Sequence, residues 1–235
     1  MNTARRIFVA IDRADRDSAA GEIERVATAG CGIKLGLEFF VANGPAGVRA
    51  VITGQPLFLD LKLHDIPNTV AGAMRAACRL EPQLVTLHAS GGLAMMRAAV
   101  AAARESSGAA APKLLAITVL TSLDEQDLES VGQDGPIADQ ARRLADLAQA
   151  AGVAGIVCSP QEVAALRTQC GPGFLLVTPG IRPSWAASGD QKRMTTPAQA
   201  IAGGADHLVI GRPITQANDP AAALARICAE IDAVA

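Results

Sequence analysis

The sequence predicts an α/β protein, a (β/α)8 TIM barrel formed as a single domain over residues 1–235. Eight short runs of β-forming residues recur along the chain, and Ala-rich segments with helical spacing lie between them. Alternating strands and helices indicate βαβ units around a parallel sheet, and a barrel of such units needs about 250 residues. No stretch rich in Pro, Gly or Ser and no shift in composition divides the chain, so we expect one domain.

The eight expected strands are short apolar runs bounded by polar or turn-forming residues. They are residues 7–11, 32–35, 57–62, 84–88, 114–119, 155–158, 175–178 and 207–210. The competing architecture is an open doubly wound sheet. A dinucleotide-binding sheet of that kind has G-x-G-x-x-G after its first strand, whereas Asp12-Arg13-Ala14-Asp15 stands there in this chain.

Helical segments are expected between the strands because apolar residues recur three or four positions apart. In residues 18–28, Ile23 and Val26 lie three apart, and Gly30 is placed to end the helix. Pro220 is placed to open the last helix of the chain. The other expected helices are residues 70–80, 92–104, 137–150 and 160–166.

The composition excludes several classes of function. There are 21 Lys and Arg residues against 23 Asp and Glu, so the chain lacks the basic character of a nucleic-acid-binding protein. No Tyr and one Trp leave little for base stacking. The apolar run 7–11 is too short for a signal sequence or a membrane span, and the five cysteines are scattered without a C-x-x-C pair. We therefore expect a cytoplasmic protein that binds neither nucleic acid nor membrane.

Charged residues fall at the carboxyl ends of the first three expected strands, where a barrel holds its active site. Asp12 ends the first strand and Lys34 lies in the second, while alternation along the third puts Asp60 and Lys62 on one face. Burying the two charges of the third strand costs several kcal/mol each unless they pair, and Lys34 and Asp12 are the available neighbours. We expect a functional charged cluster, and the alternative is a structural ion-pair network.

The charges around Lys62 restrict its chemistry. A lysine that forms a Schiff base needs burial or a second cation to favour its neutral form. A lysine flanked by carboxylates is instead held as an ammonium ion. Lys62 is therefore better suited to donating a proton than to attacking a carbonyl, which argues against an aldolase of the imine type.

The last two strands are followed by a repeated Gly-then-Arg pattern. Gly180-Ile181-Arg182 follows the seventh strand and Gly211-Arg212 follows the eighth, where barrels commonly bind phosphate. Pro213 is placed to begin a short helix. We expect a phosphate site here, with two tight turns carrying solvated arginines as the alternative.

Residues 183–193 form either a lid over the ligand or an exposed loop.

Other polar residues give weaker signals. His64, His88 and His207 have no H-x-x-x-H spacing, so no metal site is expected. Thr121 and Ser122 follow the fifth strand, where their hydroxyl groups could contact a polar ring or cap a helix.

The run Phe58-Leu59-Asp60-Leu61-Lys62-Leu63-His64-Asp65-Ile66-Pro67-Asn68-Thr69 resembles the signature of the orotidine 5′-phosphate decarboxylase family. Further matching pieces occur in the family's order over almost the whole chain. They are Ala10-Ile11-Asp12, Ile33-Lys34-Leu35-Gly36, Val119-Leu120-Thr121-Ser122, Val177-Thr178-Pro179-Gly180-Ile181-Arg182, Gly189-Asp190-Gln191 and Val209-Ile210-Gly211-Arg212-Pro213. The D-x-K-x-x-D element alone is shared with related sugar-phosphate lyases, whereas the full set is highly specific.

The resemblance implies decarboxylation of orotidine 5′-monophosphate to uridine 5′-monophosphate without a cofactor, the last step of pyrimidine nucleotide synthesis. It further implies a homodimer with shared active sites and assigns a role to each matching residue. By this resemblance, Lys62 is expected to donate the proton, within a charged network that it forms with Lys34, Asp60 and Asp65. The resemblance places Asp12 and Lys34 on the ribose, Thr121 and Ser122 on the base, Arg182, Gln191, Gly211 and Arg212 on the phosphate side, and Asp65, Ile66 and Thr69 in the neighbouring subunit's site. It also counts Asp60 among the substrate-binding residues.

Two alternatives remain at this point. One is a metal-dependent lyase or synthase of the same superfamily that acts on a sugar phosphate. In those relatives, the resemblance suggests, an acidic metal ligand stands where Lys34 stands here. The other is a nucleotide-binding barrel without catalytic activity, which predicts a broken charged network.

Overall fold

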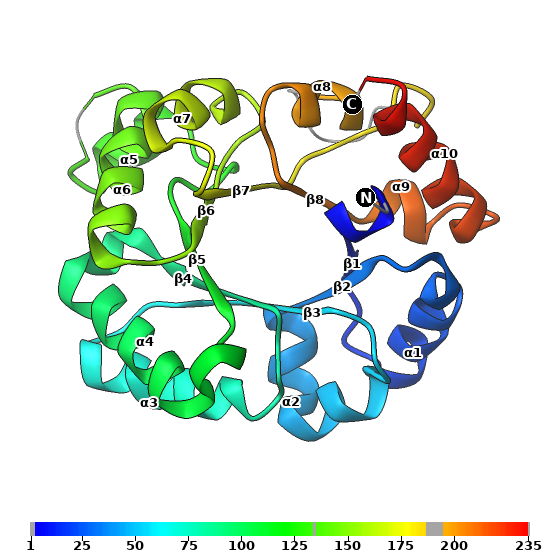
Figure 1. Ribbon diagram of the computed structural model, residues 1–235, viewed down its shortest axis with the longest axis horizontal. Coiled ribbons are helices and arrows are strands. Elements are labelled where there is room, and N and C mark those ends of the chain that lie inside the picture. Colours follow the sequence, from blue (N-terminus) through cyan, green and yellow to red (C-terminus); the bar gives the residue numbers. More distant parts are fainter. Residues whose placement is uncertain (1–2, 134, 187–194, 235) are drawn as a thin grey trace.

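Eight parallel strands close into a barrel, which confirms the fold class that the sequence predicts (Figure 1). The computed structural model describes residues 3–133, 135–186 and 195–234. Each strand pairs with the next in chain order, and the last strand pairs with the first. The strands are β1 (Ile7–Ile11), β2 (Gly32–Gly36), β3 (Leu57–Leu63), β4 (Leu84–His88), β5 (Lys113–Ile117), β6 (Gly155–Val157), β7 (Leu175–Thr178) and β8 (His207–Ile210).

Helices surround the barrel and cover the outer face of the sheet (Figure 1). The α-helices are α1 (Arg16–Glu24), α2 (Leu37–Val51), α3 (Pro67–Cys78), α4 (Gly92–Ser107), α5 (Glu125–Ser130), α6 (Ile137–Ala151), α7 (Val163–Cys170), α8 (Pro197–Ala202), α9 (Arg212–Thr215) and α10 (Pro220–Asp232). Short 3-10 turns are η1 (Thr3–Arg6), η2 (Ala27–Ala29), η3 (Ala89–Gly91) and η4 (Gly108–Ala110).

The expected elements are confirmed with shifts of a few residues, except that α1 ends at Glu24 and Gly30 instead ends η2. The sequence pattern did not predict α2, α5 or α8, and α2 is the longest of the three. Gly44 and Pro45 interrupt its apolar periodicity, and the backbone of Gly44 is non-helical (φ 60°, ψ −167°). Two helical pieces therefore meet at a kink, because proline opens a helix more readily than it continues one. The helix expected over 160–166 starts later, at Val163, since the Glu162 carboxylate accepts a hydrogen bond from the Ser159 amide in the preceding turn.

The barrel interior below the mouth is filled by apolar side chains from six strands. Phe8 and Phe58 meet edge to face with ring centroids 5.4 Å apart. Gly32 on β2 makes room for this pair, because a β-carbon there would lie 2.4 Å from the Phe8 ring. The buried residues of this interior cluster are Phe8, Ala10, Phe58, Leu84, Leu115, Val177 and Val209. The barrel is therefore closed below the mouth by a packed apolar layer.

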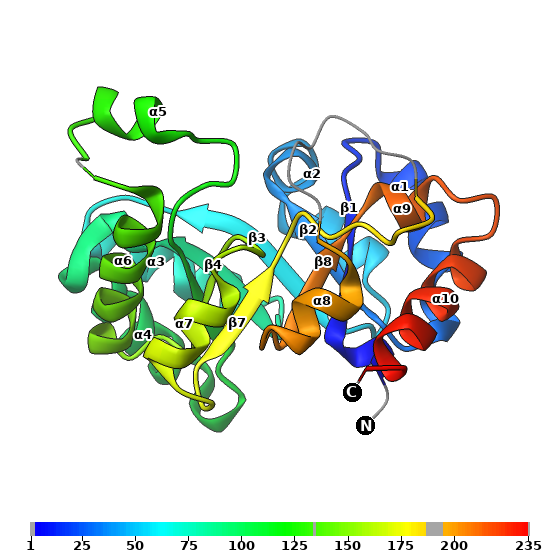
Figure 2. The ribbon, with the colours of Figure 1, turned by 90° about the horizontal axis from the view of Figure 1, so that it is seen from above.

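The two ends of the described chain lie close together, at the end of the molecule opposite the projecting α5 (Figure 2). The Thr3 hydroxyl donates to the Asp232 carboxylate, which joins η1 to α10. Among the described residues, no helix is long and apolar enough to cross a membrane. All five cysteines carry free thiols, as expected from their scattered positions.

Candidate active site

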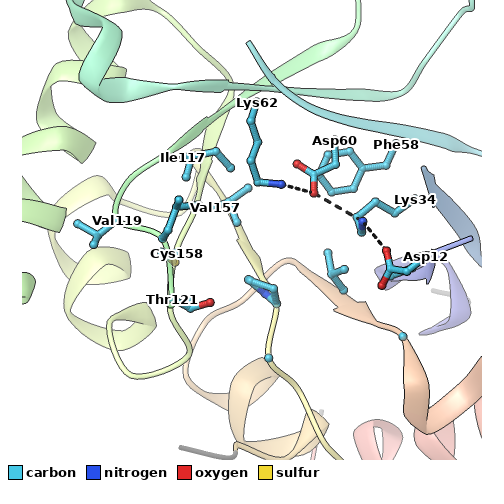
Figure 3. Close-up of a pocket in the computed structure, with 16 residues that line it drawn as sticks. Asp12, Lys34, Phe58, Asp60, Lys62, Ile117, Val119, Thr121, Val157 and Cys158 are labelled. Atoms are coloured by element: carbon cyan, nitrogen blue, oxygen red, sulfur yellow. Dashed lines mark hydrogen bonds and ion pairs between the residues drawn. The ribbon is translucent and has the colours of Figure 1, made fainter. Parts of the chain in front are cut away.

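Four charged side chains form a continuous chain of alternating sign at the barrel mouth (Figure 3). The Lys62 ammonium donates to Asp60 Oδ2 at 2.8 Å. Lys34 Nζ lies 3.6 Å from the same oxygen and 3.6 Å from Asp12 Oδ1. The structure thus brings together the four charged residues that the sequence places at the ends of the first three strands, and the carboxylates and ammonium groups offset one another's burial.

The pairing of the strands explains how Lys34 comes to lie between two carboxylates. Lys34 is level with Ala10 on β1 and Phe58 on β3, one inward-facing position below Asp12 and Asp60. Its long side chain therefore extends upward between the two carboxylates. The next inward position on β2 is Gly36, where an added β-carbon would lie 3.4 Å from Lys34 Nζ. The absence of a side chain at Gly36 leaves space for the ammonium group.

Asp60 is held by more than its two lysines. The Thr86 hydroxyl on β4 donates to Asp60 Oδ1 at 2.8 Å, so both carboxylate oxygens have partners. Burial is the largest influence on the pKa of Asp60 and acts to raise it. Lys34 and Lys62, together with the hydrogen bonds from Lys62 and Thr86, outweigh burial and hold the pKa of Asp60 below its usual range. Asp60 is therefore a fixed negative charge at neutral pH.

The backbone of Lys62 is unusual for a strand residue, with a φ of 49°. A positive φ costs roughly 1–3 kcal/mol for a residue with a β-carbon and persists only where its surroundings enforce it. The pairing of β3 with β4 is irregular between Leu59 and Leu63. The Lys62 amide donates to the Thr86 hydroxyl at 2.9 Å instead of to a backbone carbonyl of the ladder. The segment that carries the ammonium group is thus strained, and the hydrogen bond to Thr86 holds it in place.

The side of the cavity facing the lysines is apolar. The cavity holds about 300 Å³, and Phe58 lines it next to Asp60 (Figure 3). Burial raises the pKa of the Cys158 thiol, so Cys158 behaves as a neutral apolar group here. The apolar lining comes from β5, β6, β8 and the residues after them, namely Ile117, Val119, Val157, Cys158 and Val209. A flat ring would therefore lie between an ammonium group and an apolar surface.

The third part of the mouth lies after β7 and β8. Gly180 and Gly211 line the cavity, and Gly180 has a φ of 74°, which suits a residue without a β-carbon. Arg182 is buried and Arg212 is exposed at the start of α9, the short helix expected at Pro213. Gln191 and most of the loop that contains it lie outside the described residues.

The two hydroxyl residues after β5, Thr121 and Ser122, differ in their relation to the cavity. Both residues are exposed, and Thr121 lines the cavity whereas Ser122 lies outside the lining. Neither of them caps the next helix, because Asp124 is the N-cap of α5 and forms a capping box with Asp127.

The residues expected to cross to a second subunit lie outside the cavity of their own chain. Asp65, Ile66 and Thr69 are exposed at the start of α3, and Ile66 is 66% accessible. The Asp65 carboxylate accepts a hydrogen bond from the Ile66 amide at 2.6 Å.

The histidines form a pair beside the charged cluster. The rings of His64 and His88 lie 5.3 Å apart. Burial lowers the pKa of His88, and the neighbouring His64 and Lys62 lower it further. In the part of the chain that the structure describes, no three or more His, Cys, Asp or Glu side chains form a group able to hold a metal ion.

Sequence reasoning missed Thr86 and the apolar lining. Thr86 is the one hydroxyl residue in the run Leu84-Val85-Thr86-Leu87-His88, and its side chain is fully buried. A single hydroxyl inside an apolar strand next to β3 was the available signal, because a buried hydroxyl needs a partner.

The chain was compared with known proteins, and residues 5–227 match the family model described as "Orotidine 5'-phosphate decarboxylase / HUMPS family". This match covers nearly the whole chain and includes the charged cluster described above. The chain belongs to this family. The family assignment agrees with the resemblance found in the sequence motifs.

Individual relatives support the assignment. The orotidine 5′-phosphate decarboxylase of Paramagnetospirillum magneticum is 58% identical over 96% of this chain and 97% of its own length. That of Rhodospirillum rubrum is 54% identical over 96% and 93%. The crystal structure of orotidine 5′-phosphate decarboxylase from Lactobacillus acidophilus superimposes with a TM-score of 0.87 at 36% identity, covering 97% of this chain and 99% of that one.

Proposed function

We propose that this protein decarboxylates orotidine 5′-monophosphate to uridine 5′-monophosphate and CO2, the last step of pyrimidine nucleotide synthesis, and that residues 1–235 act as one decarboxylase domain. The observation that carries the proposal is the Lys62 ammonium held 2.8 Å from Asp60 in a cavity of about 300 Å³ whose opposite side is apolar. The family match and the names of the relatives support the same reaction.

The chemistry follows from that arrangement. When the bond between the pyrimidine C6 and its carboxylate carbon breaks, the electron pair remains on C6 and CO2 leaves. An ammonium group beside C6 stabilises the developing negative charge and then transfers its proton to form the C–H bond. The Lys62 amine recovers a proton from water. Asp60 holds the ammonium group in place, and its fixed charge also lies near the departing carboxylate.

The substrate-binding roles are proposed from position. Asp12 and Lys34, which line the cavity, bind the ribose hydroxyl groups. Thr121, which also lines the cavity, and Ser122 contact the pyrimidine. The phosphate lies beyond the loops after β7 and β8, towards Arg182, Gln191, Gly211 and Arg212.

The phosphate contact can be tested with a truncated substrate. Arg212→Ala should lower kcat/KM for the nucleotide by about 10- to 100-fold, the equivalent of a charge-assisted hydrogen bond, and should leave the nucleoside orotidine almost unaffected. Measuring both substrates with both proteins tests this. Equal losses on the two substrates would show that Arg212 is a solvated turn residue.

The reaction as proposed uses no cofactor and no metal ion, because the proton donor and the charge stabilisation come from side chains. Lys34 stands on the second strand, close to Asp12 and Asp60, and a cation at this position disfavours a divalent metal ion. A metal-dependent sugar-phosphate synthase predicts loss of activity after exhaustive chelation, whereas the decarboxylase should remain fully active.

We further propose a cytoplasmic homodimer with shared active sites. The exposed Asp65, Ile66 and Thr69 at the start of α3 support a contact that reaches a second subunit's cavity. Mixing inactive Lys62→Ala and Asp65→Ala proteins should regenerate sites in which both residues are intact. Activity that stays absent after demonstrated subunit exchange would exclude the shared site.

The five free thiols and the place of the reaction in nucleotide synthesis support the proposed cytoplasmic location.

The direct test is the loss of absorbance as purified protein decarboxylates orotidine 5′-monophosphate. Turnover without added metal or cofactor supports the proposal. Tight binding of uridine 5′-monophosphate with no turnover would instead indicate a nucleotide-binding barrel without catalytic activity.

A further inference from the structure

Thr86 is the buried hydroxyl that joins the backbone of one charged residue to the side chain of another. It accepts a hydrogen bond from the Lys62 amide at 2.9 Å and donates one to Asp60 Oδ1 at 2.8 Å. We propose that Thr86 is a positioning residue for the decarboxylation, because its hydroxyl sets both the backbone of Lys62 and the carboxylate of Asp60. This inference rests on the proposed function.

The pairing of β3 with β4 explains why a side chain is needed at this point. Leu59 is level with Val85, and the next paired residues are Leu63 and Leu87. Four steps along β3 (63 − 59) therefore correspond to two steps along β4 (87 − 85), so β3 contains two extra residues here. Asp60, Leu61 and Lys62 face Thr86 alone. The Thr86 hydroxyl replaces the backbone carbonyl that a regular ladder would offer to the Lys62 amide.

The direction of the two hydrogen bonds is fixed by valence. An amide can only donate, so the Thr86 oxygen must accept from Lys62. Its own proton is then available for Asp60, whose carboxylate can only accept. With Oδ1 engaged in this way, Oδ2 is turned towards the two lysines, at 2.8 Å from Lys62 and 3.6 Å from Lys34. One hydroxyl therefore orients the carboxylate that orients the ammonium group.

The same contact stabilises the strained backbone. Lys62 has a φ of 49°, and its amide would lose its partner if the hydroxyl were removed. The Thr86 side chain has 0% accessible surface, so bulk water does not reach the oxygen. Removing the hydroxyl leaves one buried donor and one buried acceptor without a partner, and both belong to the charged cluster.

Two pairs of variants isolate the hydroxyl. Thr86→Val keeps the shape of the side chain, and Thr86→Ser keeps the hydroxyl. Thr86→Ala and Thr86→Ser differ by the oxygen alone, which keeps the test valid if Thr86→Val fails to fold. The matched control is Thr118→Val, because Thr118 is a buried threonine following β5 whose hydroxyl donates to the Val157 carbonyl at 3.1 Å.

We expect Thr86→Val and Thr86→Ala to lower kcat by about 10- to 100-fold, the equivalent of losing a hydrogen bond to a charged group. The KM and the affinity for uridine 5′-monophosphate should change by less than about threefold, because the ribose and phosphate contacts come from other strands. Thr86→Ser should keep most of the parent kcat, and Thr118→Val should keep all of it.

The pH profile gives a readout that a purely structural role does not move. The charged and titratable groups around Asp60 are Lys34 on β2, Lys62 on β3 and His88 on β4. The Thr86 hydrogen bond favours the charged form of Asp60, so its loss raises the pKa of that carboxyl. Activity should therefore fall at a higher pH on the acid side in Thr86→Ala than in Thr86→Ser.

The outcomes separate this inference from the proposed function. A parent enzyme without turnover would overturn the proposed function. If the parent is active, a different outcome would overturn only the positioning role. In that outcome Thr86→Ala and Thr118→Val lower kcat by the same small factor, and the acid side of the pH profile is unchanged in both. A Thr86→Ser variant as impaired as Thr86→Ala would also overturn it, because the methyl group and not the hydroxyl would then be responsible.

Discussion

The two sides of the cavity differ in the chemistry of their side chains, since one side is charged and the other is apolar. One side is formed by Asp12, directly after β1, and by Lys34, Asp60 and Lys62 on β2 and β3 (Figure 3). The other side is formed by Ile117 on β5, Val157 on β6 and Val209 on β8. The charged side satisfies its own groups through the chain of ion pairs. Among the described residues that line the apolar side, none carries a charge that could compete for the ammonium. Because charge interactions strengthen where water is excluded, the apolar side increases the effect of the lysine on charge that develops between the two sides.

The two sides also differ in backbone regularity. β5 and β6 pair without interruption from Leu115 and Gly155 onwards. β3 departs from regular pairing with β4 between Leu59 and Leu63. A regular strand is sufficient to present an apolar surface, since packing tolerates small shifts. Placing an ammonium group needs closer control, and the irregular segment provides it at the cost of a positive φ at Lys62.

The largest expected effect comes from removing the ammonium group. Lys62→Ala should lower kcat by several orders of magnitude, beyond the ~10²–10⁴ typical of a general acid, because stabilisation of the carbanion is lost as well. The fold should persist, since Asp60 keeps Lys34 and Thr86 as partners. Steady-state kinetics and circular dichroism measure the two effects. Near-normal turnover in this variant would remove Lys62 from the mechanism.

The layer beneath both sides should control stability. Phe58→Ala removes a fully buried ring that packs on Phe8, and it should lower the free energy of unfolding by about 3–5 kcal/mol. Chemical denaturation of the parent and the variant measures the difference. Exposed Val41→Ala, on α2, is the control and should change the free energy by less than about 0.5 kcal/mol. Equal effects of the two substitutions would contradict the packed layer below the mouth.

The smallest effect should come from adding a polar group to the apolar side. Val157→Thr keeps the shape of a half-buried side chain that lines the cavity and introduces a hydroxyl. Because the hydroxyl loses its water when the substrate enters, kcat/KM should fall by roughly 5- to 30-fold, the equivalent of about 1–2 kcal/mol. Thermal unfolding should be unchanged, since the cavity of the free protein is open to water. An unaltered kcat/KM would show that the two sides do not act together.

Much of the fold could be predicted from the sequence because strand and helix periods are local. The boundaries of β1, β4, β7 and β8 match the expected ranges, since each is a short, mainly apolar run that ends in, or is followed by, a polar residue or a glycine. α2 could not be predicted in this way, because Gly44 and Pro45 mask a kinked helix whose apolar face becomes evident only when it packs on the barrel.

The sequence was sufficient to predict which charged residues of the cluster lie together. Alternation placed Asp60 and Lys62 on one face, and the strand ends placed Asp12 and Lys34 beside them. Thr86 was not predictable as their partner, because its contact depends on two extra residues in β3 relative to β4. The roles of Asp65, Ile66 and Thr69 in a second subunit stay predictions that the hybrid experiment tests.

The sequence by itself therefore determined the barrel, the position of the site at the ends of the strands, and the residues that carry charge there. Only the tertiary structure decided that Lys34 lies one layer below its two carboxylates, that Gly36 leaves space for its ammonium, and that Thr86 joins Lys62 to Asp60. The physical reason is that local sequence sets which way a side chain points along its own strand. The stagger between neighbouring strands is set by closure of the whole barrel, and this stagger fixes the distances between their side chains.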